Sequence, residues 1–137
     1  MGRGIRTIQA AIGLIERGDG RYLICQRRAG GFLGGFWEFP GGKREPGESW
    51  QVCLRRELRE ELGVSVRALK PCGAMRYRYG ARTVVFKVFR CVIARGRPQP
   101  KDAQRLRWVR ADQLRRYRFP PANRRLIAAL DRRHVLQ

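Results

Sequence analysis

Residues 37–64 restrict the fold of this chain more than any other part of its sequence. They begin with a loop ending in Pro40-Gly41-Gly42, where glycine permits backbone conformations that other residues avoid. Three leucines spaced four residues apart follow, which is the period of one helix face, and Gly63 stands where helices commonly end. The segment therefore predicts a glycine loop and then a helix over residues 49–62. The buried face of this helix would carry Leu54, Leu58 and Leu62.

Short apolar or alternating runs predict strands in the rest of the chain. A last helix is expected to begin at Pro120-Pro121 and to pack through its apolar residues. Helices separated by several strands, without regular strand and helix alternation, favour an α/β domain with a mixed sheet covered by helices. We expect one domain over residues 1–137. The predicted strands cover residues 10–15, 22–25, 64–66, 74–79, 83–93 and 106–109.

The net charge of the chain indicates which kinds of molecule it could bind. The 137 residues contain 31 Lys and Arg against 11 Asp and Glu, a formal net charge of +20. Such a field attracts phosphates on nucleotides or nucleic acid, although an arginine-rich genome would leave the same composition. A stripe in which Arg76 and Arg78 alternate with Tyr77 and Tyr79 is open to the same two interpretations, nucleic-acid contact or an ordinary two-sided strand.

Several classes of protein are excluded by composition. The apolar fraction of 43% is too high for a long disordered chain, and no run approaches the roughly 18 apolar residues of a membrane span. The first residues do not resemble a signal peptide, so we expect a cytoplasmic protein without membrane contact. The cysteines are too widely spaced for an ordinary zinc site, and their apolar neighbours predict buried thiols. These cysteines are Cys25, Cys53, Cys72 and Cys91.

Acidic residues are scarce, yet five of them fall within one short segment. Glu57, Glu60 and Glu61 occupy an arc of roughly 100° on the predicted helix, so their carboxylates converge. Because like charges at this spacing repel, a cation should compensate them. Neighbouring arginines are one candidate, and a divalent metal such as Mg²⁺ or Mn²⁺ is the other, since both ions prefer oxygen ligands. The remaining two acids of the segment are Glu45 and Glu48.

The wider spacing resembles a known pattern. Gly42, five residues, Glu48, seven residues and then Arg56-Glu57-Leu58-Arg59-Glu60-Glu61-Leu62-Gly63-Val64 match the box of the Nudix hydrolases, G-x5-E-x7-R-E-U-x-E-E-x-G-U, without a gap. U denotes an aliphatic residue. The match places the box at residues 42–64. The resemblance implies an α/β/α sandwich with a mixed sheet, and an enzyme that cleaves a diphosphate linked to another moiety.

The resemblance also implies roles for residues of the box. Glu60 and Glu61 would bind the metal together with the Gly41 carbonyl, and Glu57 would act as general base or as a further ligand. Arg56 would orient Glu57, while Glu48 would hold the loop against the helix. These roles agree with the chemistry of diphosphate hydrolysis, because divalent cations neutralise phosphate oxygens and a carboxylate can activate water.

A narrower resemblance concerns the substrate. Three pieces outside the box are similar to the MutT-like group, which hydrolyses oxidised purine triphosphates such as 8-oxo-dGTP to the monophosphate and pyrophosphate. That activity would imply sanitation of the nucleotide pool and mutation avoidance. The pieces are Gln26-Arg27-Arg28-Ala29, Glu38-Phe39-Pro40-Gly41-Gly42-Lys43 and Phe119-Pro120-Pro121-Ala122-Asn123.

These pieces supply the candidate substrate-binding residues. By the resemblance Asn123 would read the purine edge, and its amide has the donors and the acceptor to do so; otherwise it would cap the last helix. Arg28 would contact phosphate or sugar, or else be one more surface arginine. Phe39 would border the base pocket or else pack in the core, and Glu38 is a further substrate-binding candidate. The family often has a further acid before the strand that carries Trp108. Arg107 directly precedes this Trp, so either Asp102 takes the role or the metal relies on the helix alone.

Two other functions remain open. The same box serves pyrophosphohydrolases acting on NTP, CTP or a 5′-triphosphate RNA end, and the charge of +20 would suit RNA. A non-catalytic Nudix module that binds nucleic acid or an effector is the second alternative. Such modules commonly lose box carboxylates, whereas Glu57, Glu60 and Glu61 are all present. The intact acids favour catalysis.

Overall fold

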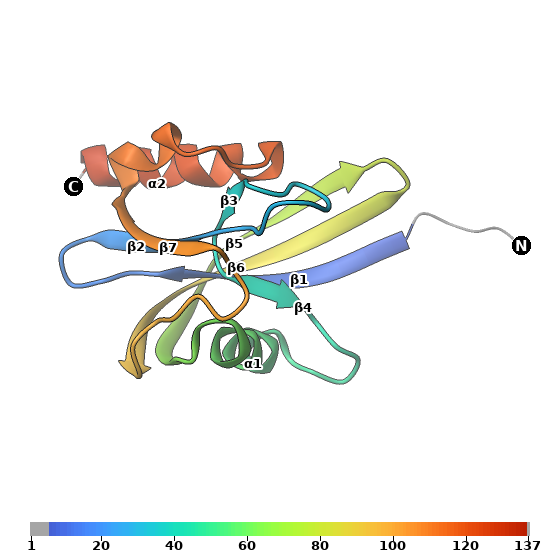
Figure 1. The fold of residues 1–137 in the computed structure, drawn as a ribbon, viewed down its shortest axis with the longest axis horizontal. Coiled ribbons are helices and arrows are strands. Elements are labelled where there is room, and N and C mark those ends of the chain that lie inside the picture. Colours follow the sequence, from blue (N-terminus) through green and yellow to red (C-terminus); the bar gives the residue numbers. More distant parts are fainter. Residues whose placement is uncertain (1–5, 137) are drawn as a thin grey trace, which may run out of the picture.

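Two β-sheets form the middle layer of the protein, with a long helix on each side (Figure 1). The structure, a computed structural model, describes residues 6–136, with side chains over 7–132. The elements in chain order are β1 (Arg6–Ile15), β2 (Arg21–Gln26), β3 (Trp37–Glu38), β4 (Gly41–Lys43), α1 (Trp50–Leu62), β5 (Ser65–Tyr79), β6 (Arg82–Arg95), β7 (Arg105–Arg110), the 3₁₀ helices η1 (Ala111–Arg116) and η2 (Pro121–Asn123), and α2 (Arg124–Leu136).

The predicted mixed sheet is confirmed. Its order is β4-β1-β6-β5, with β1 and β6 parallel and the other neighbours antiparallel. A second, antiparallel sheet of order β3-β2-β7 accompanies it, which the sequence did not predict. The short strands β3 and β4 flank Phe39 and Pro40, so one chain passes from the second sheet to the first just before the acidic helix. This crossing brings the acids of the loop and the helix together.

The helix predicted over residues 49–62 is confirmed as α1. Ser49 caps its N-terminus, where the hydroxyl oxygen accepts a hydrogen bond from the Val52 amide at 3.1 Å. Gly63 ends it with a left-handed φ of 73°, and the Gly63 amide donates to the Arg59 carbonyl. The leucine face is fully buried against the sheets, which leaves the glutamates on the sides of the helix. The buried leucines are Leu54, Leu58 and Leu62.

The segment between α1 and β6 differs from its prediction. Two separate strands were expected, at 64–66 and 74–79, but a single long strand, β5, pairs with β6 through several register shifts. Ala68 at φ 57° lies at one of these irregularities. The apolar alternation breaks there, so no local pattern indicates a strand; pairing with β6 supplies one. Pro71 is tolerated because β5 is the edge strand of its sheet.

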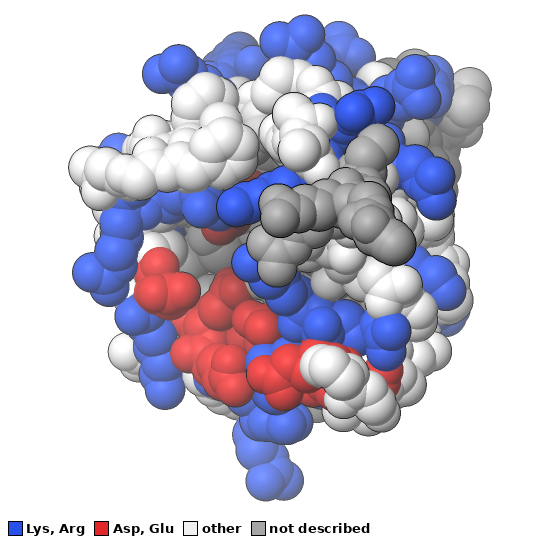
Figure 2. Space-filling model, turned by 90° about the vertical axis from the view of Figure 1, so that its right-hand side faces the viewer, with Lys and Arg blue, Asp and Glu red and all other residues white. Residues whose placement is uncertain are grey.

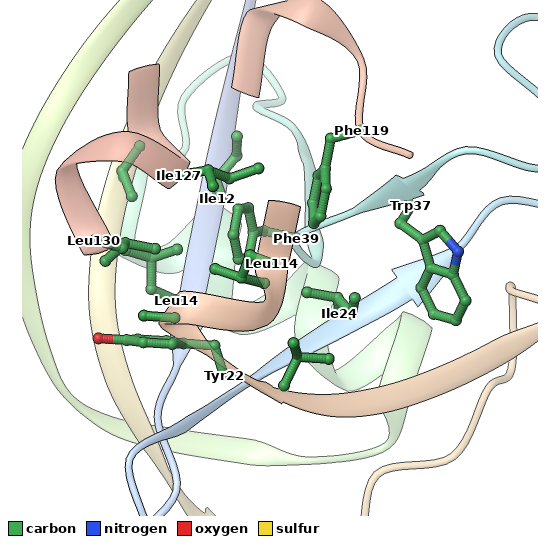
Figure 3. Packing of buried hydrophobic residues seen from close by; sticks show 13 residues of the cluster. Ile12, Leu14, Tyr22, Ile24, Trp37, Phe39, Leu114, Phe119, Ile127 and Leu130 are labelled. Atoms are coloured by element: carbon green, nitrogen blue, oxygen red, sulfur yellow. The ribbon is translucent and has the colours of Figure 1, made fainter. Parts of the chain in front are cut away.

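The second helix packs on the opposite side of the sheets. Ile127 and Leu130 of α2 lie over Ile12 and Leu14 of β1 (Figure 3). The α-helix begins at Arg124 rather than at the predicted Pro120-Pro121, because residues 121–123 form the 3₁₀ turn η2 first. This turn places Asn123 in a buried position beside the core cluster.

The cysteine prediction is wrong in one place. Cys25, Cys53 and Cys91 are buried free thiols, but Cys72 is exposed, because it lies in the irregular part of the edge strand β5. Among residues 6–136, none of the helices has the length and apolar character needed to cross a membrane.

Candidate active site

Arg56 is the centre of the site. Its guanidinium donates two hydrogen bonds to the Glu48 carboxylate, from Nε to Oε2 at 2.6 Å and from Nη2 to Oε1 at 2.9 Å. Nη1 also donates to Glu57 Oε1 at 3.0 Å and to Glu60 Oε2 at 3.3 Å, while Nη2 reaches the Lys43 carbonyl at 3.1 Å. A planar, permanently charged guanidinium suits such a multiple role. One arginine therefore ties the loop to two glutamates of α1.

Glu48 is the loop's main partner in this network. The Arg56 guanidinium lowers the pKa of the Glu48 carboxyl to about 2, and the Glu45 amide, which donates to Glu48 Oε1 at 2.8 Å, adds to the effect. Both contacts stabilise the ionised carboxylate. This is the geometry that the role predicted for Glu48 requires, since it joins the loop end to the helix.

Glu48 should therefore stabilise the fold in a pH-dependent way. Its pKa is depressed in the folded state, so its contribution is present above its unfolded value, roughly 4.3, and is lost as the pH falls towards 2. We expect the difference in unfolding free energy between the wild type and Glu48→Gln to shrink over that range, as measured by urea unfolding at pH 7, 4 and 2.5. Glu45→Gln is the control, because its 3.8 Å contact with Arg56 is exposed and weak. A difference that stays constant down to pH 2.5 would contradict this account.

Gly42 lies directly beneath the Glu57 carboxylate. A Cβ at this position would stand 2.3 Å from the carboxyl carbon and from Oε2 of Glu57. No side chain fits into that space without moving Glu57. The glycine of the loop therefore lets the backbone of β4 approach the helix closely enough to hold the glutamate between Gly42 and Arg56.

This contact makes Gly42→Ala a test of Glu57 positioning. We expect the added methyl group to displace the Glu57 carboxylate and to lower kcat by about 10- to 100-fold, because small misplacements of reacting groups are costly. The matched control is Gly18→Ala, where a Cβ meets no atom within 4 Å. Steady-state kinetics on one nucleotide substrate would compare the two variants. Equal, near-normal rates would remove Gly42 from this role.

Glu61 is the most electrostatically perturbed acid of the site. Burial, the largest cause, and the negative charges of Glu57, Glu38 and Asp102 together raise its pKa to about 8, against a hydrogen bond from the Gly41 backbone that lowers it. Burial also raises the pKa of Glu38, again with a contribution from Asp102. Acids from three separate segments thus surround one half-buried carboxyl. Figure 2 shows acidic side chains gathered in a patch that Lys and Arg border.

A cleft of about 260 Å³ adjoins these acids. Two acids, Glu38 and Asp102, and two arginines, Arg27 and Arg28, line it. Arg27 donates to Glu38 at 3.0 Å, while Arg28 reaches the Lys101 carbonyl at 3.4 Å. A cavity with cations beside clustered carboxylates suits a polyphosphate that meets a metal at one end. The other lining residues are Gly30, Gly31 and Phe32.

The sequence of the chain matches the model of a known family. The family model described as NUDIX domain matches residues 11–129. The chain is a Nudix hydrolase. It is 33% identical to the CTP pyrophosphohydrolase of Escherichia coli, over 91% of this chain and 92% of the relative. It is 30% identical to the 8-oxo-dGTP diphosphatase of the same organism, over 93% and 99%.

A solved structure agrees with the fold. The solution structure of the E. coli ORF135 protein has a TM-score of 0.83 to this Nudix hydrolase at 30% identity, covering 97% of this chain and 94% of that one. Together with the family match, these likenesses make the protein a MutT-like Nudix pyrophosphohydrolase with an α/β fold. Enzymes of this family act on nucleotide substrates and generally use divalent metals.

The donor set of this Nudix hydrolase fits a divalent cation, although its side chains are not gathered around one. Within residues 7–132, no three Asp, Glu, His or Cys side chains stand close enough together to coordinate an ion. Arg56 holds Glu57 and Glu60 instead. Burial and acidic neighbours raise the pKa of Glu61, and a nearby cation would lower it again by stabilising the ionised carboxylate. Glu60 is 60% exposed, so its side chain is free to turn towards such an ion.

The structure separates the predicted residues into three groups. Gly41, Glu48, Arg56, Glu57, Glu60 and Glu61 belong to the acidic site, and Arg28, Glu38 and Asp102 to the adjoining cleft. Phe39 and Asn123 lie instead on the α2 side, where Phe39 stacks on Phe119 at 5.2 Å between ring centroids (Figure 3). Two cleft residues were missed, namely Arg27 and Phe32. Arg27 directly precedes the chosen Arg28, and an exposed Phe in a glycine-rich loop was the available signal for Phe32.

Proposed function

We propose that the protein hydrolyses a nucleoside triphosphate to the monophosphate and pyrophosphate with the help of Mg²⁺ or Mn²⁺, and that 8-oxo-dGTP is its preferred substrate. The observation that carries the reaction is the acid group around the half-buried Glu61, at the edge of a cleft that arginines also line. Carboxylates and arginines together match the two charges of a metal–triphosphate complex.

In this proposal the chain's own groups have distinct tasks. Glu57, Glu60 and Glu61 would hold the metal, with Gly41 and Asp102 as further ligands, and a metal held there would supply charge neutralisation of the phosphates and activation of water. Glu57 accepts the proton of the attacking water, and Arg56 holds the Glu57 carboxylate through its 3.0 Å hydrogen bond. Arg28 contacts the phosphates from the wall of the cleft.

Base recognition is assigned to the α2 side. Asn123 is the one buried polar side chain among residues 7–132, at 8% exposure, and it follows the Phe39 and Phe119 pair along the chain. A buried amide offers both donors and an acceptor to an oxidised guanine edge. Glu38 and Phe39 would complete the binding of the nucleoside. The relative named 8-oxo-dGTP diphosphatase supports this choice.

The deciding experiment measures kcat/KM for 8-oxo-dGTP, dGTP, dCTP, CTP and a 5′-triphosphate RNA, with Mg²⁺ and with Mn²⁺ and with products identified. We expect 8-oxo-dGTP to be preferred and to give 8-oxo-dGMP and pyrophosphate. Glu60→Gln, run beside the wild type, controls for a contaminating hydrolase. Preference for CTP would overturn the substrate and favour the second candidate, a CTP pyrophosphohydrolase, which the 33% identical relative supports. RNA-directed activity would place the enzyme at RNA 5′ ends.

Asn123→Ala tests the base assignment directly. The variant removes the amide that would pair with the oxidised purine, so kcat/KM for 8-oxo-dGTP should fall by about 10-fold or more. The value for dCTP should change much less, because a pyrimidine would not make the same contacts. Equal losses for both nucleotides would point to damaged packing rather than to lost recognition. Asn123→Asp serves as a companion variant that keeps the side-chain size.

A further inference from the structure

The hairpin of β5 and β6 carries a strongly one-sided charge. Between Leu62 and Asp102 the sequence has ten Lys and Arg residues and no Asp or Glu. Among the described arginines of this hairpin, only Arg90 forms an ion pair. Its partner is Glu16, the residue directly after β1. Arg78 and Arg82, at the hairpin tip, are exposed and form no ion pair with any described acid. The tip therefore presents uncompensated positive charge.

Aromatic rings gather at the same tip. Tyr77 and Tyr79 are two residues apart on β5, so they share a face of the strand, and their ring centroids are 4.8 Å apart. Phe32, from the loop between β2 and β3, meets Tyr79 edge-on at 5.8 Å. Arg82 lies opposite Tyr79 in the strand register, on the same face, while the Arg78 guanidinium turns to the tip and donates to the Gly80 carbonyl at 2.9 Å.

This group is not explained by packing alone. Phe32 is 65% exposed, one of two large apolar side chains in residues 7–132 that are exposed to such a degree. Its ring contact reaches from a glycine-rich loop to a hairpin more than forty residues further along the chain. Phe32 also lines the cleft, so the aromatic group continues from the proposed nucleotide site onto the surface. An exposed ring beside unpaired arginines resembles neither a core residue nor a purely solvated face.

We propose that Phe32, Tyr77 and Tyr79, with Arg78 and Arg82, form a binding site for single-stranded nucleic acid. Bases would stack on the aromatic rings, and the two arginines would pair with the phosphates between them. A single strand fits better than a duplex, because the faces of its bases are free to stack. The site lies outside the acidic centre and needs neither the metal nor hydrolysis.

The test is fluorescence anisotropy with a dT oligonucleotide of about 15 nucleotides, a length that spans typical single-strand sites. The oligonucleotide has a 5′-hydroxyl and a 3′ label, and EDTA is present, so neither the metal nor the pyrophosphohydrolase activity affects the result. Phe32→Ala and Tyr79→Ala should each raise Kd by about 10-fold, the usual effect of losing one stacking ring. Tyr79→Phe, which keeps the ring, should bind like the wild type.

Charge is tested with two matched double variants. R78Q/R82Q removes two charges from the tip, and R67Q/R95Q removes two from the other end of the same hairpin, where Arg95 lies opposite Ser65. The tip variant should raise Kd by about 10-fold and reduce the salt slope of log Kd by about 1.4, whereas the control should change Kd by less than about threefold. Equal effects of the two double variants, or tighter binding of a duplex of equal length, would overturn the proposal. Because Phe32 is exposed, its variant keeps the test decisive even if Tyr79→Ala is unstable.

Discussion

Glu57→Gln is expected to lower kcat by about 10²- to 10⁴-fold while leaving the protein folded. Glutamine keeps the size of the side chain, so the contact with Gly42 stays filled, but it removes the charge that binds a cation or accepts a proton. Glu60→Gln and Glu61→Gln should act in the same direction, since they remove proposed metal ligands. The measurement is kcat and KM under saturating Mg²⁺, with circular dichroism to check the fold.

Glu45→Gln is the matched control for these variants. Glu45 belongs to the same acidic segment, but it is 65% exposed and its carboxylate reaches Arg56 only at 3.8 Å. Its loss should change kcat by less than about twofold, because an exposed pair at this distance is weak. If Glu57→Gln retained a rate within about threefold of the wild type, Glu57 would be neither a base nor a metal ligand.

Arg56→Met is expected to reduce both stability and activity. Glu48 and Glu57 are 12% and 16% exposed and Arg56 is 19% exposed, so loss of the arginine leaves two shielded carboxylates without their counter-charge. Removal of one partner from such a network lowers the unfolding free energy, and Tm falls with it. kcat should also fall, because Glu57 loses the hydrogen bond that holds it.

A double variant shows how much of the stability lost with Arg56 comes from its pairing with Glu48. Arg56→Met combined with Glu48→Gln removes both members of the closest pair, so its loss of stability should be smaller than the sum of the two single losses. Arg56→Lys should lie between the wild type and Arg56→Met, since lysine keeps the charge but cannot grip Glu48 with two hydrogen bonds. Urea unfolding of the four variants gives the comparison. Strictly additive losses would show that Arg56 and Glu48 do not act as a unit.

Local features of the sequence were sufficient to predict α1 and the acids it carries. The leucine period and the position of Gly63 depend on residues only a few positions apart, so the sequence alone showed them. The structure adds that Ser49 caps the helix and that Gly63 is left-handed. The position of β5 was not predictable in the same way. Its middle part has no alternation, and only hydrogen bonding to β6, a partner in another segment, makes it a strand.

The acids of the helix show the same difference between what the local sequence predicts and what the fold decides. Their convergence follows from 3.6 residues per turn, and the box spacing identifies the family from the residues alone. The sequence left open whether arginine or metal would balance these carboxylates. Arg56 contacts Glu57 and Glu60 along the same helix, whereas the fold brings Glu48 to it from the loop and leaves Glu61 half-buried among other acids.

Residue types and their periods along the chain thus decide which helix forms and which groups it carries, because hydrogen bonds within a helix and its caps are local. The chemical state of those groups depends on segments that meet only after folding. Glu38 and Asp102 reach Glu61 from β3 and from the loop before β7, and with Arg27 and Arg28 they shape the cleft. A pKa depends on burial and on every charge nearby, so the tertiary structure alone brings the Glu61 carboxyl to a pKa of about 8.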